Sequence, residues 1–184
     1  MKEKHERIWN VPNALTMLRM LLIPVYWVLY MSGRSYFALA VFVLASATDL
    51  LDGYIARKHH LITSFGKLMD PLADKLMVIS VMLSMVVTGV LPWPPLAILL
   101  LKETLMVLGG AVMLKKGVVV YAKKAGKYAQ TLVVASLLLS FFADWFNRAV
   151  GVPVHLIALW CAVALTLYAF VFYARDAARI MAER

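Results

Sequence analysis

The sequence predicts an all-α membrane protein with six transmembrane helices and a short N-terminal interfacial helix. Hydrophobic residues make up 63% of the 184-residue chain and charged residues only 16%, a balance far from that of soluble domains. Six stretches are apolar enough, and nearly all long enough, to cross a hydrocarbon core of roughly 30 Å as helices. Basic residues gather in alternate connections between these stretches, as in multi-pass membrane proteins.

The N-terminal arm covers residues 1–12, and its charged part ends in Ile8 and Trp9. This pattern favours a short helix at the membrane interface with its aromatic end among the headgroups; a disordered polar arm is the alternative. Asn13 follows Pro12 and is expected to cap the first transmembrane helix.

The predicted transmembrane helices follow in order along the chain. They cover residues 14–31, 36–56, 68–90, 92–114, 128–146 and 153–174. The second is the least apolar because its last third contains Asp49 and Asp52, yet its length and period favour a helix. Because the chain has neither an internal repeat nor a low-complexity segment, we expect a single domain over residues 1–184.

Six spans place both termini on the same side of the membrane. Most of the 19 Lys and Arg residues lie in the N-terminal arm, in the connections after the second and fourth stretches, or after the sixth, whereas the opposite connections contain only Arg34 and Arg148. The positive-inside rule therefore places both termini in the cytoplasm and predicts a multi-pass protein of the cell (cytoplasmic) membrane. With its charges distributed in this way, the net charge of +9 reflects membrane topology, and we expect no nucleic-acid partner.

Four of the ten acidic residues lie between positions 49 and 74, at the predicted cytoplasmic ends of the second and third helices. Asp49 and Asp52 are three residues apart, and Asp70 and Asp74 are four apart, so each pair occupies one face of its helix. If these faces meet, the four carboxylates lie close together. Helix caps or surface ion pairs are the alternative for a single aspartate, but they do not explain four at this spacing.

Carboxylates gathered in a poorly hydrated place must be neutralised by cations or by protons. Oxygen ligands favour Mg²⁺ or Mn²⁺ over Zn²⁺, and four carboxylates suit two ions better than one. Cys161, the only cysteine, lies in an apolar stretch, and we interpret His59 and His60 as a solvated loop pair. Two ions of this kind commonly clamp a phosphate during displacement.

Small residues accompany the aspartates. Gly53 and Ala56 lie on the carboxylate face of the second helix, and Gly66 lies on that of the third. Small residues allow close packing, but next to charge they also suggest space kept open for a ligand. Arg57 borders that space and is suited to pair with a phosphate.

The order of these residues resembles the signature of the CDP-alcohol phosphotransferase (CDP-alcohol phosphatidyltransferase class I) family. Every defining position is present in Asp49-Leu-Leu-Asp52-Gly53-Tyr-Ile-Ala56-Arg57, followed after eight residues by Gly66-Lys-Leu-Met-Asp70-Pro-Leu-Ala-Asp74. The stretch from Asn10 to Arg19 and the dipeptide Gly126-Lys127 are also similar to the family. The resemblance implies a six-helix homodimer with a polar cavity toward the cytoplasm, which transfers a phosphatidyl or similar group from a CDP-linked donor to an alcohol and releases CMP.

The resemblance also implies roles for individual residues. Asp49, Asp52, Asp70 and Asp74 would bind two Mg²⁺ or Mn²⁺ ions, and Asp74 would also be the general base in an in-line attack without a covalent intermediate. The CDP moiety would be held by Asn13, Thr16, Asp52, Gly53, Ala56, Arg57 and Gly66.

Within the family, the chain looks most like the phosphatidylglycerophosphate synthases. That likeness implies CDP-diacylglycerol as donor, glycerol 3-phosphate as acceptor, and a place in phospholipid biosynthesis. A phosphorylated acceptor requires cations near the metals, and the candidates are Lys75, Lys123, Lys124, Lys127 and Arg175. Arg19 and Lys102 lie inside apolar stretches, so we expect each to face the cavity, with a pair between Lys102 and Glu103 as the alternative.

Other functions stay open at this point. Gly109-Gly110 and Lys115-Lys116-Gly117 resemble the CMP-forming cardiolipin synthases, which accept phosphatidylglycerol, and inositol phosphate or serine are further possible acceptors. A divalent-cation transporter or a non-catalytic membrane scaffold is the reading from another class. Against it, the outer halves of the predicted helices contain no acid except Asp144, so no carboxylate path crosses the bilayer.

Overall fold

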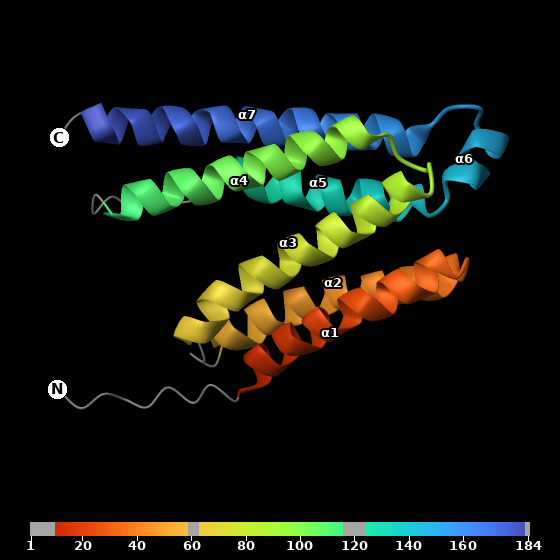
Figure 1. The fold of residues 1–184 in the computed structure, drawn as a ribbon, viewed down its shortest axis with the longest axis horizontal. Helices are drawn as coiled ribbons and strands as arrows, with labels where there is room; N and C mark the ends of the chain where they lie inside the picture. Colours follow the sequence, from red (N-terminus) through yellow and green to blue (C-terminus); the bar gives the residue numbers. More distant parts are fainter. Residues whose placement is uncertain (1–9, 59–62, 116–123, 183–184) are drawn as a thin grey trace. The chain divides into compact units, whose positions relative to one another are not determined.

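The structure is a computed structural model in which the described residues form helices and no strands. It describes residues 10–58, 63–115 and 124–182, without the side chains of residues 50, 52–54, 56, 57, 64, 65, 67, 68, 114, 115, 124, 125, 181 and 182. The helices, shown in Figure 1, are α1 (Val11–Met31), α2 (Ser35–Lys58), α3 (Ser64–Val87), α4 (Trp93–Lys115), α5 (Lys124–Ser140), α6 (Ala143–Ala149) and α7 (Val154–Ala182). The predicted all-α class is confirmed for this part of the chain.

α1 begins earlier than the sequence pattern predicts. Asn10 is its N-cap, because the Asn10 Oδ1 atom accepts a hydrogen bond from the backbone N–H of Asn13 at 2.9 Å. Pro12 lies in the first turn, where its missing N–H leaves no helical bond unmade. The prediction that Asn13 is the cap is therefore wrong, and the Asn13 side chain is buried against other parts of the fold. The predicted interfacial helix falls on residues 1–9, which lie outside the described residues.

Three of the described helices are long and apolar enough to cross a membrane: Val11–Met31, Trp93–Met113 and Val154–Ile180. α5 and α6 form a fourth candidate if the bent pair is counted as one span. α2 and α3, which carry the aspartate pairs, are not among them, although Ser35–Asp49 is a shorter apolar helix. The structure thus supports a multi-pass membrane protein with three or four spans among the described residues, and the six-span layout stays a prediction.

The predicted span over 128–146 is not one continuous helix. α5 ends at Ser140 and α6 begins at Ala143, with a bend of 72° between them. The Ser140 hydroxyl donates to the backbone carbonyl four residues before it at 2.8 Å, a contact that commonly bends helices. The N–H groups of Phe141 and Phe142 then bond to carbonyls three residues back, at 3.3 and 3.0 Å, which tightens the last turn and ends the helix.

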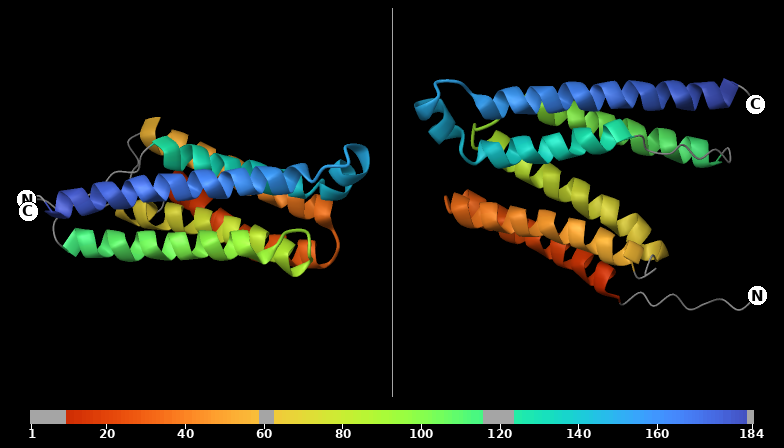
Figure 2. Two further views of the ribbon diagram at one scale, coloured as in Figure 1. Left: turned by 90° about the horizontal axis from the view of Figure 1, so that it is seen from above. Right: turned by 180° about the vertical axis from the view of Figure 1, so that it is seen from behind.

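The chain divides into two compact units, Met1–Ser84 and Met85–Arg184. In the first unit, α1 and α2 lie side by side as a hairpin (Figures 1 and 2). Gly33 in its turn has a φ of 74°, a conformation that favours glycine. α3 runs parallel to α1, because its contacts advance in the same direction along both helices, from Thr16–Asp70 to Tyr26–Ser84. The apolar core of this unit includes Tyr26, Ala38, Phe42, Ala45, Ala73, Met77 and Val81.

In the second unit, α5 and α7 lie side by side, and α4 also contacts α7. Its core includes Met85, Leu91, Leu137, Leu159, Ala162 and Val163. Many side chains that face away from this core, such as Leu101 and Leu108 on α4 and Trp160 on α7, are exposed and apolar. An exposed apolar surface of this kind is expected where helices contact lipid.

Candidate active site

Three polar side chains lie buried on one face of the otherwise apolar α1. Asn13, Thr16 and Arg19 follow one another at intervals of three residues, and their exposed fractions are 4%, 0% and 1%. A polar or charged group buried in an apolar span is costly unless it is paired. Each of the three finds its partner elsewhere in the first unit, on α2, on α3 or just before α3.

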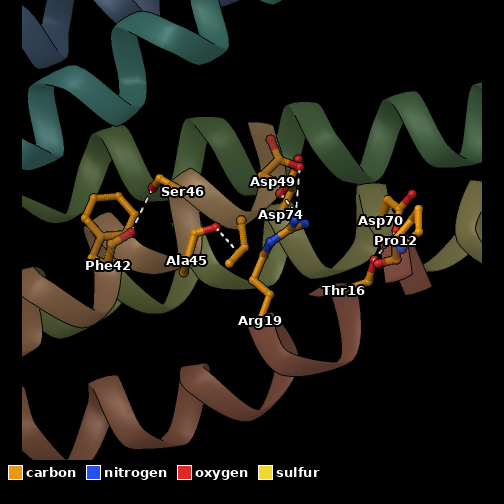
Figure 3. A network of polar contacts seen from close by, with 10 residues as sticks. Pro12, Thr16, Arg19, Phe42, Ala45, Ser46, Asp49, Asp70 and Asp74 are labelled. Carbon is orange, nitrogen blue, oxygen red and sulfur yellow. Dashed lines mark hydrogen bonds and ion pairs between the residues drawn. The ribbon is translucent and has the colours of Figure 1, made fainter. Parts of the chain in front are cut away.

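Arg19 lies between the two carboxylate-bearing helices (Figure 3). Its Nη1 atom is 2.8 Å from Oδ1 of Asp74 on α3, and its Nη2 atom is 3.2 Å from Oδ1 of Asp49 on α2. One guanidinium group therefore joins residues from three helices, with a charge-assisted hydrogen bond to Asp74. The structure brings together Asp49 and Asp74, which the spacing assigned to two separate helix faces.

Thr16 makes the corresponding contact with Asp70, one turn earlier on α3. The Thr16 hydroxyl lies within hydrogen-bond distance of the Asp70 carboxylate and 3.1 Å from the backbone carbonyl of Pro12. A hydroxyl has one hydrogen to donate, so these two acceptors share it. α1 thus contacts both aspartates of α3 through side chains on a single face.

Asn13 packs where the chain enters α3. Its amide Nδ2 and the Thr63 hydroxyl are 3.1 Å apart, and the same hydroxyl is 3.1 Å from Asn13 Oδ1 and accepts the backbone N–H of Gly66 at 3.0 Å. Gly66 is required for this approach, since a Cβ atom there would lie 2.8 Å from Asn13 Oδ1. The space beside Gly66 is therefore filled by Asn13, and the role of Gly66 in holding CDP stays a prediction.

The charges at this site favour a cation. Among the ion pairs of the described residues, the single guanidinium group of Arg19 meets two carboxylates, those of Asp49 and Asp74, and Asp70 lies one turn before Asp74. Asp49 and Asp74 are each about one-third exposed, which leaves part of each carboxylate accessible. Their hard oxygen atoms are the ligand type that Mg²⁺ and Mn²⁺ prefer, so the residues fit such an ion. Within the described residues, no three acidic, histidine or cysteine side chains form a ligand group, and the side chain of Asp52 lies outside them.

The remaining predicted site residues are only partly described. Asp52, Gly53, Ala56 and Arg57 belong to α2, but their side chains lie outside the described residues. Lys75 follows Asp74 on α3 and is partly buried.

The other acceptor candidates belong to the second unit. Lys127 and Arg175 are exposed there, Lys124 begins α5 without a described side chain, and Lys123 falls outside the described residues. Their part in binding the acceptor stays a prediction. Lys102 forms an ion pair with Glu103, which confirms the alternative predicted for Lys102.

The sequence predicts that Arg19 faces the cavity but gives it no partner, and it does not assign Thr63 to the site. Arg19 carried a signal, because it is a charge inside an apolar stretch and lies three residues after Thr16 on the same face. That signal indicated a buried, functional charge but not its partners. Thr63 carried no signal that distinguishes it from other loop threonines.

A sequence model of the CDP-alcohol phosphatidyltransferase family matches residues 9–168. A CDP-diacylglycerol–glycerol-3-phosphate 3-phosphatidyltransferase of Bacillus subtilis (strain 168) is 33% identical over 178 aligned residues, which cover 87% of this chain and 91% of that relative. One from Rickettsia typhi is 53% identical over 72 residues, 38% of this chain and 40% of that relative. A human cardiolipin synthase (CMP-forming) is 27% identical over 200 aligned residues, 97% of this chain and 66% of that relative.

Proposed function

The chain belongs to the CDP-alcohol phosphatidyltransferase family, and from this premise we propose that it is a CDP-diacylglycerol–glycerol-3-phosphate 3-phosphatidyltransferase. Its substrates would be CDP-diacylglycerol and glycerol 3-phosphate, and its products phosphatidylglycerophosphate and CMP. The observation that carries the proposal is the meeting of Asp49 and Asp74 at Arg19, with Asp70 one turn before Asp74. This arrangement brings three of the four signature aspartates, from two helices, near one another.

The proposed cofactors are two Mg²⁺ or Mn²⁺ ions, held by Asp49, Asp52, Asp70 and Asp74. When bound, they would offset the charge of the donor's pyrophosphate and of the leaving phosphate. The carboxylate oxygens of Asp49, Asp70 and Asp74 support this choice, because hard oxygen ligands suit these ions.

Asp74 is the proposed general base. It would take the proton of the acceptor hydroxyl while the hydroxyl oxygen forms a bond to the phosphorus next to the lipid, and the bond from that phosphorus to the CMP oxygen breaks. One carboxylate oxygen of Asp74 forms an ion pair with Arg19, which fixes its position. The Asp74 side chain is about one-third exposed, so the carboxylate stays accessible. The reaction requires no nucleophilic serine or cysteine.

The ligand-binding residues complete the proposal. Asn13, Thr16, Asp52, Gly53, Ala56, Arg57 and Gly66 would hold the CDP group, and Lys75, Lys123, Lys124, Lys127 and Arg175 would supply cations for the acceptor phosphate. We further propose a homodimer in the cytoplasmic membrane, surrounded by membrane lipids, with both termini and a polar active-site cavity on the cytoplasmic side. The distribution of basic residues supports this orientation.

The deciding experiment offers the purified protein CDP-diacylglycerol with glycerol 3-phosphate, phosphatidylglycerol, inositol phosphate or serine in separate reactions. CMP release and the lipid product are measured in each. Phosphatidylglycerophosphate from glycerol 3-phosphate is the expected result. Cardiolipin from phosphatidylglycerol would instead support the second candidate, a CMP-forming cardiolipin synthase; a human protein of that name is 27% identical to this chain. Divalent-ion flux without CMP release in any reaction would support a transporter and overturn both.

A further inference from the structure

We propose that Arg19 is a positioning residue of the active site, whose buried guanidinium group holds Asp49 and Asp74 and thereby sets their spacing for divalent-ion binding. The inference rests on the proposed function, in which both aspartates are metal ligands. It assigns the arginine a task that the aspartate signature, residues 49–74, does not contain.

The three side chains differ in burial. The arginine side chain is 1% exposed, whereas Asp49 and Asp74 are 37% and 35% exposed. The guanidinium group is therefore buried, whereas about one-third of each aspartate side chain stays accessible. An ion that arrives from solvent meets the aspartates on that accessible surface.

The geometry of the contact also matters. The two terminal nitrogens of Arg19 reach Oδ1 atoms on two different helices, at 2.8 and 3.2 Å. The guanidinium group is planar and its donors are fixed relative to one another, so it restrains the separation of the two carboxylates. A lysine ammonium in the same place carries the same charge but is a single point without this fork.

A second residue of α1 acts in the same way on the neighbouring aspartate. Thr16, fully buried, contacts the Asp70 carboxylate one turn before the Arg19–Asp74 contact. The described acidic residues of the cluster are therefore all contacted by one face of α1. This common origin indicates a support for the carboxylates and not a chance ion pair.

An opposite role for Arg19 is physically possible and makes the opposite prediction. If the guanidinium group occupied the place of the ion, it would compete with it, and removing the arginine would strengthen ion binding. If it supports the ligands, removing it weakens ion binding. Residues that orient metal ligands typically change metal affinity by about 10- to 100-fold when replaced.

The test measures the binding of Mn²⁺ alone to the full-length protein in detergent, from the electron paramagnetic resonance signal of free Mn²⁺. Arg19→Gln is expected to bind Mn²⁺ about 10- to 100-fold more weakly than the unaltered protein. Arg19→Lys should show a smaller loss. Arg34→Gln is the matched control, because it makes the same change at an exposed arginine in the turn after α1, and its affinity should be unchanged.

Tighter binding by Arg19→Gln would overturn the proposal in favour of competition, and unchanged binding would overturn it outright. If Arg19→Gln does not elute as a folded species in size-exclusion chromatography, Arg19→Lys decides, and an unaltered Mn²⁺ affinity in that variant overturns the proposal.

Activity gives a second readout: the Mn²⁺ concentration for half-maximal CMP release should rise in Arg19→Lys, and excess Mn²⁺ should restore the rate. Arg19-dependent Mn²⁺ binding without turnover on any acceptor would refute the proposed function alone, whereas turnover with Arg19-independent Mn²⁺ binding would refute this inference alone.

Discussion

Replacing Gly66 with alanine tests whether this glycine serves the packing of α1 against α3. The added Cβ atom would lie 2.8 Å from Asn13 Oδ1, 3.3 Å from Thr63 Oγ1 and 3.5 Å from Asp70 Oδ2. The first distance is too short for atoms in contact, so something must move. Asn13 cannot turn away freely, because its amide is bonded to Thr63 and its side chain is 4% exposed.

The expected destabilisation follows from three contributions. Overpacking a well-packed interior costs about 1–3 kcal/mol. Weakening the contact between Asn13 and Thr63 adds about 0.5–1.5 kcal/mol. Alanine in place of glycine stabilises a helix by about 1 kcal/mol, which offsets part of this loss. The net loss is about 0.5–3.5 kcal/mol, or about 1–14 °C in melting temperature for a chain of this size.

The assay is thermal unfolding of the purified variants in detergent. Gly109→Ala is the matched control, because Gly109 also lies in a helix and a Cβ atom there meets nothing within 4 Å, so this variant should melt at the unaltered temperature or slightly above it. Adding Asn13→Ala to Gly66→Ala removes the opposing oxygen, and the double variant should be no less stable than Asn13→Ala alone. A Gly66→Ala protein that melts at the unaltered temperature yet binds CDP-diacylglycerol poorly would refute the packing argument and favour a space kept for the nucleotide.

Three further results are expected. Asp74→Asn should lower the rate of CMP release by about 10²–10⁴-fold, the usual contribution of a general base, while CDP-diacylglycerol binding is largely retained; near-normal turnover would contradict the assignment. Chelation of divalent ions should abolish CMP release, and added Mg²⁺ or Mn²⁺ should restore it, whereas a chelator-insensitive enzyme would rule out the two-ion proposal. Thr16→Val should lower stability by about 1–2 kcal/mol because Asp70 loses a hydroxyl donor, and Thr16→Ser should retain the contact; equal melting temperatures for the two would show that the hydroxyl contributes nothing.

Helical period was sufficient to place side chains on the faces of single helices. Asp70 and Asp74, four residues apart, both meet the buried face of α1 as the spacing predicts.

Helix ends were less predictable, because Asn10 and Asn13 flank the same Pro12 and both are good caps. Only the backbone conformation shows that Asn10 takes that place.

The bend after Ser140 was likewise absent from the hydropathy pattern. The run from 128 to 146 is long and apolar enough for one helix, but serine hydroxyls compete for backbone carbonyls within it. Such local competition leaves the average hydropathy almost unchanged. The average hydropathy of the segment therefore cannot locate the bend between α5 and α6.

The all-α class and the family follow from the sequence alone, because apolar length and the aspartate spacing are properties of single segments. It also marked Arg19 as a charge that an apolar helix does not tolerate without a partner. The identity of that partner depends on how the helices pack. Arg19 meets Asp49 and Asp74, far away along the chain, because the packing of three helices brings them within 3.2 and 2.8 Å of one guanidinium group. Contacts between distant residues depend on how the helices pack against one another, and the hydrophobic period of a single helix does not specify that packing.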